Sequence, residues 1–218
     1  MIKALVFDFD GLIIDTESVW YDSYREVLSG YGMDLKIEDF SKVIGTTDEV
    51  LYQHIRENVE TKIDRDTIEK ETHEIYKIKM GEPVLREGVE DYLKAAKEKG
   101  IRIALASSSS RQWVEGYIRQ LGIIEYFEVI KTRDDVSKVK PDPELYMKAV
   151  EALGIESSEA LAFEDSLNGL MAARKAGLHC AIVPNPVTSN LEFEDYQVRI
   201  SSMGEMTLDA LLDKISDK

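Results

Sequence analysis

Two pairs of acidic residues in this chain each follow a short apolar run. Asp8 and Asp10 come after one run, and Glu164 and Asp165 come after another. Carboxylates at the end of a buried strand are costly unless they are paired or bind a cation. Their oxygens suit Mg²⁺, which binds through few carboxylates together with a substrate phosphate. Either pair alone is common in loops and at helix starts, but together they indicate a site for a metal and a phosphate.

A serine run, residues 107–110, follows a third apolar run and precedes a helical pattern. Ser107 and Ser108 could bind a phosphate there, because helix N-termini favour anions. Ser110, next to the helix, is expected to serve as its N-cap.

Lysines could provide the cation that a phosphate site needs. Lys140 is followed by Pro141 and Pro143, which restrict the backbone and favour a fixed cation over a solvated one. Lys138 is the alternative, and the residues themselves leave both open.

These candidate residues must be positioned by strands and helices that alternate along the chain. Strand-length apolar runs span residues 4–7, 101–106, 129–130, 160–163 and 180–183, and helical patterns span 89–99, 111–121, 144–153 and 167–176. Strands that are apolar throughout and alternate with helices predict an α/β fold, a Rossmann-like parallel sheet with helices on both faces. Ligands bind outside the carboxyl ends of such strands, where the candidate residues would converge.

The region 15–86 breaks this alternation. It shows helical periodicity around residues 20–28, 48–59 and 65–80 but no convincing buried strand. We therefore expect a helical cap domain at 15–86, inserted into a core domain of residues 1–14 and 87–218.

The charge balance excludes several partners. With 27 basic and 42 acidic residues among 218, the formal charge is −15, which would repel nucleic acid and anionic membrane surfaces. No apolar run approaches the length of a membrane span, and Asp8 comes too early for a signal peptide. We expect a cytoplasmic monomer with no nucleic-acid or membrane partner. Cys180 is the only cysteine, so an intrachain disulfide is excluded.

The candidate motifs, in this order and at these spacings, resemble those of the haloacid dehalogenase superfamily. They are Asp8-x-Asp10-Gly11, Ser107, Lys140-Pro141 and Glu164-Asp165-Ser166. A helical insertion just after the first strand resembles the β-phosphoglucomutase-like phosphatase branch of that superfamily. The resemblance covers essentially the whole chain.

The resemblance implies phosphoryl transfer through an aspartyl phosphate. Asp8 would be the nucleophile, and Asp10 would protonate the leaving group and then deprotonate water. Ser107, Ser108 and Lys140 would bind the transferring phosphoryl group. Lys140 is preferred over Lys138 because Pro141 follows it directly, as in the family pattern.

The resemblance also implies Mg²⁺ as the cofactor. Asp8, the main-chain carbonyl of Asp10 and Asp165 would bind the ion, with Glu164 as a further ligand or just behind it.

The cap should close over the site and contact the leaving group. The candidates for this contact are Thr16, Glu17, Trp20, Thr46 and Asp48, of which Trp20 could equally be a packing residue of the cap. Mutases of this branch have a histidine and an arginine where this chain has Trp20 and Asp48, which disfavours a bound second phosphate.

These observations predict a Mg²⁺-dependent phosphatase that acts on a small phosphorylated metabolite, of a sugar or nucleotide type. An intramolecular sugar phosphomutase is the alternative. A non-catalytic binding protein is disfavoured because every catalytic position is filled.

Overall fold

The computed structural model describes residues 1–45, 49–59 and 64–216, and within them it contains one parallel six-stranded sheet in the order β3-β2-β1-β4-β5-β6. The strands are β1 Ala4–Phe7, β2 Arg102–Ala106, β3 Val129–Lys131, β4 Ala160–Glu164, β5 His179–Ile182 and β6 Val198–Arg199. The predicted α/β parallel-sheet fold is confirmed.

The helices fall into two groups. Those around the sheet are α5 Val89–Glu98, α6 Arg111–Gln120, α7 Glu144–Leu153, α8 Leu167–Lys175 and α9 Leu208–Ser216, with short 3₁₀ turns η2 Ile124–Tyr126, η3 Arg133–Asp135 and η4 Ser157–Glu159. Those between β1 and β2 are α1 Thr16–Gly30, α2 Ile37–Phe40, η1 Ser41–Val43, α3 Glu49–Asn58 and α4 Arg65–Met80.

Helices cover both faces of the sheet, because alternate residues of each strand point to opposite sides. Large side chains such as Phe7 and Phe163 pack against α5, α6 and α9. On the other face, small residues such as Ala104 and Ala162 pack against α7 and α8. The buried residues of the central strands β1, β2 and β4 can therefore be apolar on both faces, as the sequence indicates.

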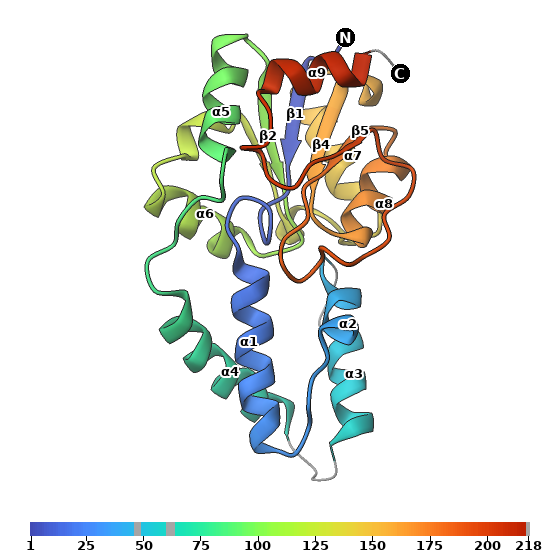
Figure 1. Cartoon of the computed structure of the whole chain (residues 1–218). Coiled ribbons are helices and arrows are strands. Elements are labelled where there is room, and N and C mark those ends of the chain that lie inside the picture. The colour runs from blue at the N-terminus through green and yellow to red at the C-terminus, as the bar shows by residue number, and fades with distance from the viewer. Residues whose placement is uncertain (46–48, 60–63, 217–218) are drawn as a thin grey trace.

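The strand β1 lies between β2 and β4, and the strand order reverses there, with β2 and β3 on one side and β4, β5 and β6 on the other (Figure 1). Such a switch point is where open α/β sheets bind ligands. The ladder continues one residue past the strand, since the Asp8 amide donates to the Phe163 carbonyl at 3.0 Å. The first residue beyond β1 is thereby fixed at the binding edge.

The helices α1–α4, called the helical unit below, lie beyond the carboxyl ends of the strands (Figure 1). α1 packs along α4, and a buried cluster including Leu28, Phe40 and Ile55 joins these helices. The Asp15 side chain caps α1 by accepting from the Ser18 amide at 3.1 Å. The short connection from β1 to α1 thus has a defined end.

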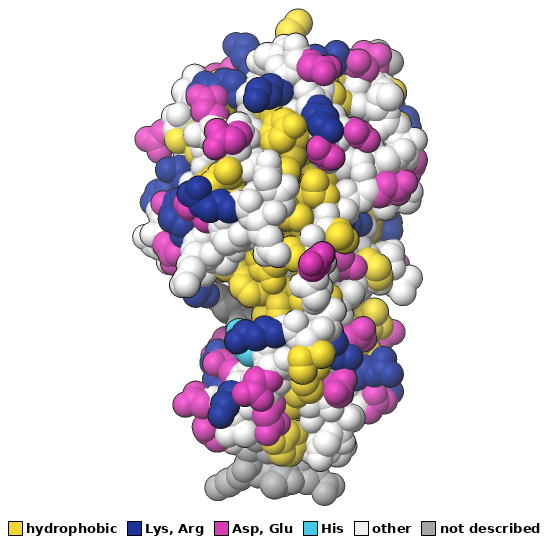
Figure 2. Space-filling view, turned by 90° about the vertical axis from the view of Figure 1, so that its left-hand side faces the viewer, with side chains coloured by type: hydrophobic (Ala, Val, Ile, Leu, Met, Phe, Trp, Pro, Cys, Tyr) yellow, Lys and Arg dark blue, Asp and Glu magenta, His cyan; other side chains and the backbone are white. Residues whose placement is uncertain are grey.

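On the side that carries α4, α5 and α6, hydrophobic side chains gather along the middle of the molecule, across the junction of its two parts (Figure 2). Trp113 and Tyr117 of α6, Met80 at the end of α4 and Leu85 after it are partly buried against the core. In the described ranges, no helix combines the length and apolarity needed to cross a membrane.

Candidate active site

The predicted core residues converge at the carboxyl ends of β1, β2 and β4. Asp8 is buried, and its Oδ1 accepts a hydrogen bond from Lys140 Nζ at 2.6 Å. The same ammonium group donates to Glu164 Oε1 at 2.7 Å. Lys140 itself is 1% exposed, whereas Lys138 is exposed and its main-chain amide donates to Glu144. Lys140 is therefore the cation of this cluster.

Glu164 is the last residue of β4 and is held from several sides. Besides Lys140, the Tyr146 hydroxyl of α7 donates to its Oε1, and the Lys140 ammonium lies 5.1 Å from the Tyr146 ring centroid. A Cβ at Gly169 of α8 would overlap the Glu164 carboxyl group. Glycine at this point of α8 is what makes room for a buried carboxylate.

Asp165 follows Glu164, and only one of its two carboxylate oxygens has a hydrogen-bond partner among the described residues. Its Oδ2 accepts from Asn185 Nδ2 at 2.6 Å, and the side-chain Oδ1 of Asn185 accepts from the amides of Val187 and Thr188. Its Oδ1 is buried with no hydrogen-bond partner among the described residues. Leaving a buried polar atom unsatisfied is costly, so this oxygen is suited to a ligand.

The carboxylates of Asp8, Glu164 and Asp165 could hold a metal ion. One oxygen from each lies within 4.8 Å of the others, and all three residues are buried. Hard oxygen donors of this kind fit Mg²⁺. The unsatisfied Asp165 oxygen is a further reason to regard the cluster as a fit for such an ion.

The electrostatics of the cluster show an excess of negative charge. Burial raises the pKa of Asp8 despite the attraction of Lys140, raises that of Glu164 to about 7, and raises that of Asp165 well above its usual range. Burial alone would lower the pKa of Lys140, but the neighbouring carboxylates Asp8 and Glu164 raise it. One lysine does not balance three buried acids, and a divalent cation would.

Asp10 faces a different set of partners. Its Oδ1 accepts from the Thr16 hydroxyl at 2.9 Å and from the Trp113 indole nitrogen at 2.9 Å, and its Oδ2 accepts from the Ser109 hydroxyl at 2.5 Å. Gly11, which follows, has φ +73°, and a Cβ there would overlap Asp165 and Asn185. The turn that follows Asp10 therefore requires glycine.

The serine run lies at the same edge of the sheet. Ser107 is buried, and its hydroxyl accepts from the Ser109 amide at 3.0 Å. Ser108 instead donates to the Gly45 carbonyl at 3.0 Å, linking the core to the helical unit. Ser110 caps α6, as expected, by accepting from the Trp113 amide.

The predicted cap residues have different surroundings. Thr16 contacts Asp10, and a Cβ on Gly11 would lie 2.9 Å from Glu17 Cγ, so both lie at the site. Trp20 stacks on Tyr76 with ring centroids 4.0 Å apart, so it packs within the helical unit, and it stays a candidate from the sequence for contact with the leaving group. Thr46 and Asp48 lie outside the described residues.

Sequence reasoning missed several residues that support the cluster. Tyr146, Asn185 and Trp113 are brought in by tertiary packing, and no local motif marks them. Arg86 was also missed, and its guanidinium donates to the carbonyls of Gly11, Val183 and Pro184. It thereby ties the end of the α4–α5 connection to the loops that carry the site.

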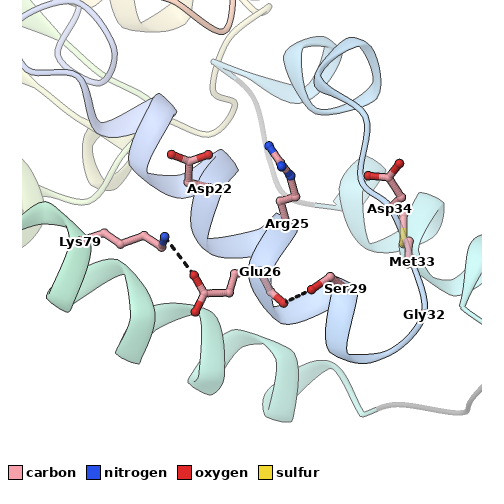
Figure 3. Close-up of a pocket in the computed structure, with 8 residues that line it drawn as sticks. All are labelled: Asp22, Arg25, Glu26, Ser29, Gly32, Met33, Asp34 and Lys79. Atoms are coloured by element: carbon pink, nitrogen blue, oxygen red, sulfur yellow. Dashed lines mark hydrogen bonds and ion pairs between the residues drawn. The ribbon is translucent and has the colours of Figure 1, made fainter.

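A surface hollow of about 660 Å³ lies elsewhere, between α1, the loop that follows α1 and the end of α4 (Figure 3). Its lining includes Asp22, Arg25 and Glu26, and Lys79 pairs with Glu26 at 2.9 Å. It contains none of the converging residues, so we place the candidate site at the strand ends and not in this hollow.

Comparison with known proteins identifies the family to which this chain belongs. The family model of haloacid dehalogenase-like hydrolases matches residues 5–183, which contain all the converging residues described above except Asn185 and its two amide partners. The chain belongs to this family.

Relatives within the haloacid dehalogenase-like family include proteins named as phosphatases. The chain is 46% identical over 219 residues to the phosphatase-named protein YhcW of Bacillus subtilis, covering 100% of both chains. It is 32% identical over 179 residues to a phosphorylated carbohydrates phosphatase of Thermotoga maritima, covering 81% of this chain and 82% of that protein.

Solved structures of the family agree with the fold. CbbY of Rhodobacter sphaeroides in complex with xylulose 1,5-bisphosphate is 31% identical, with a TM-score of 0.78 over 97% of this chain and 99% of that one. A β-phosphoglucomutase of Clostridium difficile shares the fold with a TM-score of 0.79 over 100% and 98% of the two chains, at 22% identity. As a haloacid dehalogenase-like hydrolase with phosphatase relatives, the chain is a phosphatase.

Proposed function

We propose that this phosphatase hydrolyses phosphate monoesters of small phosphorylated carbohydrates, with Mg²⁺, through an aspartyl phosphate on Asp8. The observation that carries the proposal is the buried Asp8 carboxylate, bonded to Lys140 beside the Glu164 and Asp165 carboxylates. The names of the Thermotoga relative and of the CbbY complex support a carbohydrate phosphate as the substrate.

Asp8, Asp165 and the main-chain carbonyl of Asp10 would hold the metal, with Glu164 as a further ligand or just behind it. When bound, Mg²⁺ would offset negative charge on the phosphoryl oxygens. The same positive charge would favour the ionised forms of acids whose pKa values burial raises.

The protein residues would perform two steps. In the first, an Asp8 oxygen attacks phosphorus while Ser107, Ser108 and Lys140 bind the phosphoryl oxygens, and Asp10 gives a proton to the departing ester oxygen. In the second, water attacks the aspartyl phosphate and loses a proton to Asp10, which restores both carboxyl groups. Ser108 would first have to release the Gly45 carbonyl.

We further propose that residues 1–14 and 87–218 form a core domain and residues 15–86 a cap. The helical unit lies over the carboxyl ends of the strands, where it would exclude water during the first step (Figure 1). Thr16 and Glu17 would contact the substrate from the cap side. Thr46 and Asp48 stay candidates from the sequence.

A panel of phosphorylated metabolites tests the proposal. Phosphate release would be measured for sugar phosphates, polyol phosphates and nucleotides, with Mg²⁺ and with EDTA. The highest kcat/KM is expected for a carbohydrate phosphate, with no turnover in EDTA and recovery on adding Mg²⁺. Turnover that persists in EDTA would contradict the metal role, and a nucleotide as the best substrate would contradict the substrate class.

A further inference from the structure

The Trp113 indole lies between the proposed acid–base residue and the helical unit. Its nitrogen donates to Asp10 Oδ1 at 2.9 Å. Trp113 belongs to the first turn of α6, and the Ser110 hydroxyl accepts a hydrogen bond from its amide. The indole therefore extends from a capped helix end, close to the serine run.

The ring of Trp113 packs against aromatic residues of both parts of the molecule. Its centroid lies 4.9 Å from that of Tyr117 on α6, 6.0 Å from that of Trp20 on α1 and 5.5 Å from that of Tyr76 on α4. The hydroxyls of Tyr76 and Tyr117 lie 3.3 Å apart. The position of the indole thus depends on how the helical unit packs on the core.

The chemistry of the three donors distinguishes the two oxygens of Asp10. An indole nitrogen can only donate a hydrogen bond, so Trp113 requires Oδ1 to be an acceptor. The Thr16 hydroxyl accepts from the Gly11 amide at 3.2 Å and donates to the same Oδ1. Oδ2 contacts the Ser109 hydroxyl, which can either donate or accept.

We propose that Trp113 is a positioning residue for Asp10. The indole N–H keeps Oδ1 of Asp10 as an acceptor and leaves Oδ2 to exchange the proton. This inference rests on the proposed acid–base role of Asp10. In the first step the Oδ2–H bond breaks as a proton passes to the departing ester oxygen, and in the second Oδ2 takes a proton from water. Since the indole also packs on Trp20 and Tyr76, the orientation of Asp10 is coupled to the docking of the helical unit.

Trp113→Phe tests this, because it removes the N–H and keeps an aromatic ring. We would measure kcat and KM for a sugar phosphate, whose alkoxide needs protonation, and for p-nitrophenyl phosphate, whose leaving group does not. The variant should lower kcat for the sugar phosphate about tenfold, with KM and the p-nitrophenyl phosphate rate changed less than about twofold. The ratio of the two rates comes from one preparation, so a misfolded fraction cancels.

Tyr117→Phe is the matched control, since it removes a hydroxyl from the same aromatic cluster and leaves the indole N–H. It should change the ratio much less than Trp113→Phe does, because it leaves the donor to Asp10 in place. In an Asp10→Ala background, Trp113→Phe should have no further effect on the ratio. A similar loss in that background, or an unchanged ratio in Trp113→Phe alone, would overturn the inference. If Asp10→Ala itself left the ratio unchanged, the acid–base role in the proposed function would fail first.

Nuclear magnetic resonance provides a readout that does not depend on turnover. The chain has two tryptophans, so its ¹⁵N spectrum should show two indole N–H signals, which Trp113→Phe assigns. Asp10→Ala should move the Trp113 signal and leave the Trp20 signal in place. A Trp113 signal that does not respond to Asp10→Ala would show that the hydrogen bond is absent in solution.

Discussion

Asp8 lies where its carboxylate can react only if nearby cations hold it in its charged form. Asp8→Asn replaces an oxygen by a nitrogen of similar size, so the fold should persist while the acyl phosphate can no longer form. We expect less than about 1% of the wild-type rate, with an unchanged far-ultraviolet circular dichroism spectrum. Substantial residual turnover would contradict the covalent mechanism.

The raised pKa values of the buried acids make metal-free stability depend on pH. The pKa of Glu164 is about 7 in the folded protein against an ordinary value of 4.5. Glu164 therefore binds more protons in the folded than in the unfolded state between these values, so its contribution to stability is fully present below about pH 4.5 and is lost as the pH rises through about 7. The difference corresponds to about 3 kcal/mol for this one group, as an order of magnitude.

Thermal unfolding in EDTA from pH 4.5 to 7.5 should show this decline, and Glu164→Gln should flatten it. Mg²⁺ should raise the Tm more at pH 7.5 than at pH 5, because it binds the deprotonated acids. A Mg²⁺ effect on Tm that does not depend on pH would contradict the assignment of the buried carboxylates as ligands.

At the scale of elements, α8 approaches β4 closely because Gly169 has no side chain. Gly169→Ala should displace the Glu164 carboxyl group, destabilise the protein by about 1–3 kcal/mol and lower activity. Gly116→Ala on α6 is the matched control, since its Cβ would meet nothing within 4 Å. It should stabilise by about 0.5–1 kcal/mol with unchanged turnover. Urea unfolding and phosphate release would measure both, and similar effects of the two substitutions would contradict this account.

Most elements of the sheet could be predicted from the sequence, because β1, β2 and β4 are buried on both faces and are apolar apart from Arg102 at the start of β2 and Glu164 at the end of β4. The strand β6, Val198–Arg199, could not, since two residues show no periodicity. The order of the strands in the sheet could not be predicted from local patterns either, because it depends on which distant segments pair.

The candidate site divides in the same way. Asp8 and Glu164 could be predicted because their motifs lie at strand ends, which the topology brings together. Lys140, in the loop between β3 and α7, could be predicted because Pro141 follows it directly. Tyr146 and Asn185 could not, because they reach the site only through the packing of α7 and of the loop after β5. The packing of Trp20 likewise depends on the distant helix α4.

At the scale of the whole molecule, hydrogen bonds from α8 join the helical unit to the core. They lie away from the aromatic cluster of Trp20, Tyr76, Trp113 and Tyr117. Asn168 Nδ2 of α8 donates to the carbonyls of Ile44 at 2.8 Å and Lys42 at 3.4 Å. Asn168→Ala should weaken closure by about 1 kcal/mol and lower kcat/KM about fivefold. Asn190→Ala, at an exposed loop position, is the control and should leave the kinetics unchanged. A loss of stability without a change in kcat/KM would contradict a role in closure.

A mutase would need the helical unit to hold a second phosphate while the sugar intermediate reverses its orientation in the site. Trp20 offers no cation and is packed on Tyr76, so the aspartyl phosphate should be lost to water. With β-glucose 1-phosphate and a trace of the 1,6-bisphosphate, inorganic phosphate should form without glucose 6-phosphate. Isomerisation that outpaces phosphate release would make the chain a mutase.

The central place of β1 also sets an order of events during synthesis. Its neighbours begin at Arg102 and Ala160, so the ribosome delivers all of α1–α4 before β1 has a partner strand. Contacts between α1 and α4 can form early. Pairing of β1 must wait until the long segments between β1 and its partners β2 and β4 have been synthesised and have closed into loops. Until β2 is synthesised, the nascent chain therefore carries an unpaired apolar strand directly before Asp8 and Asp10.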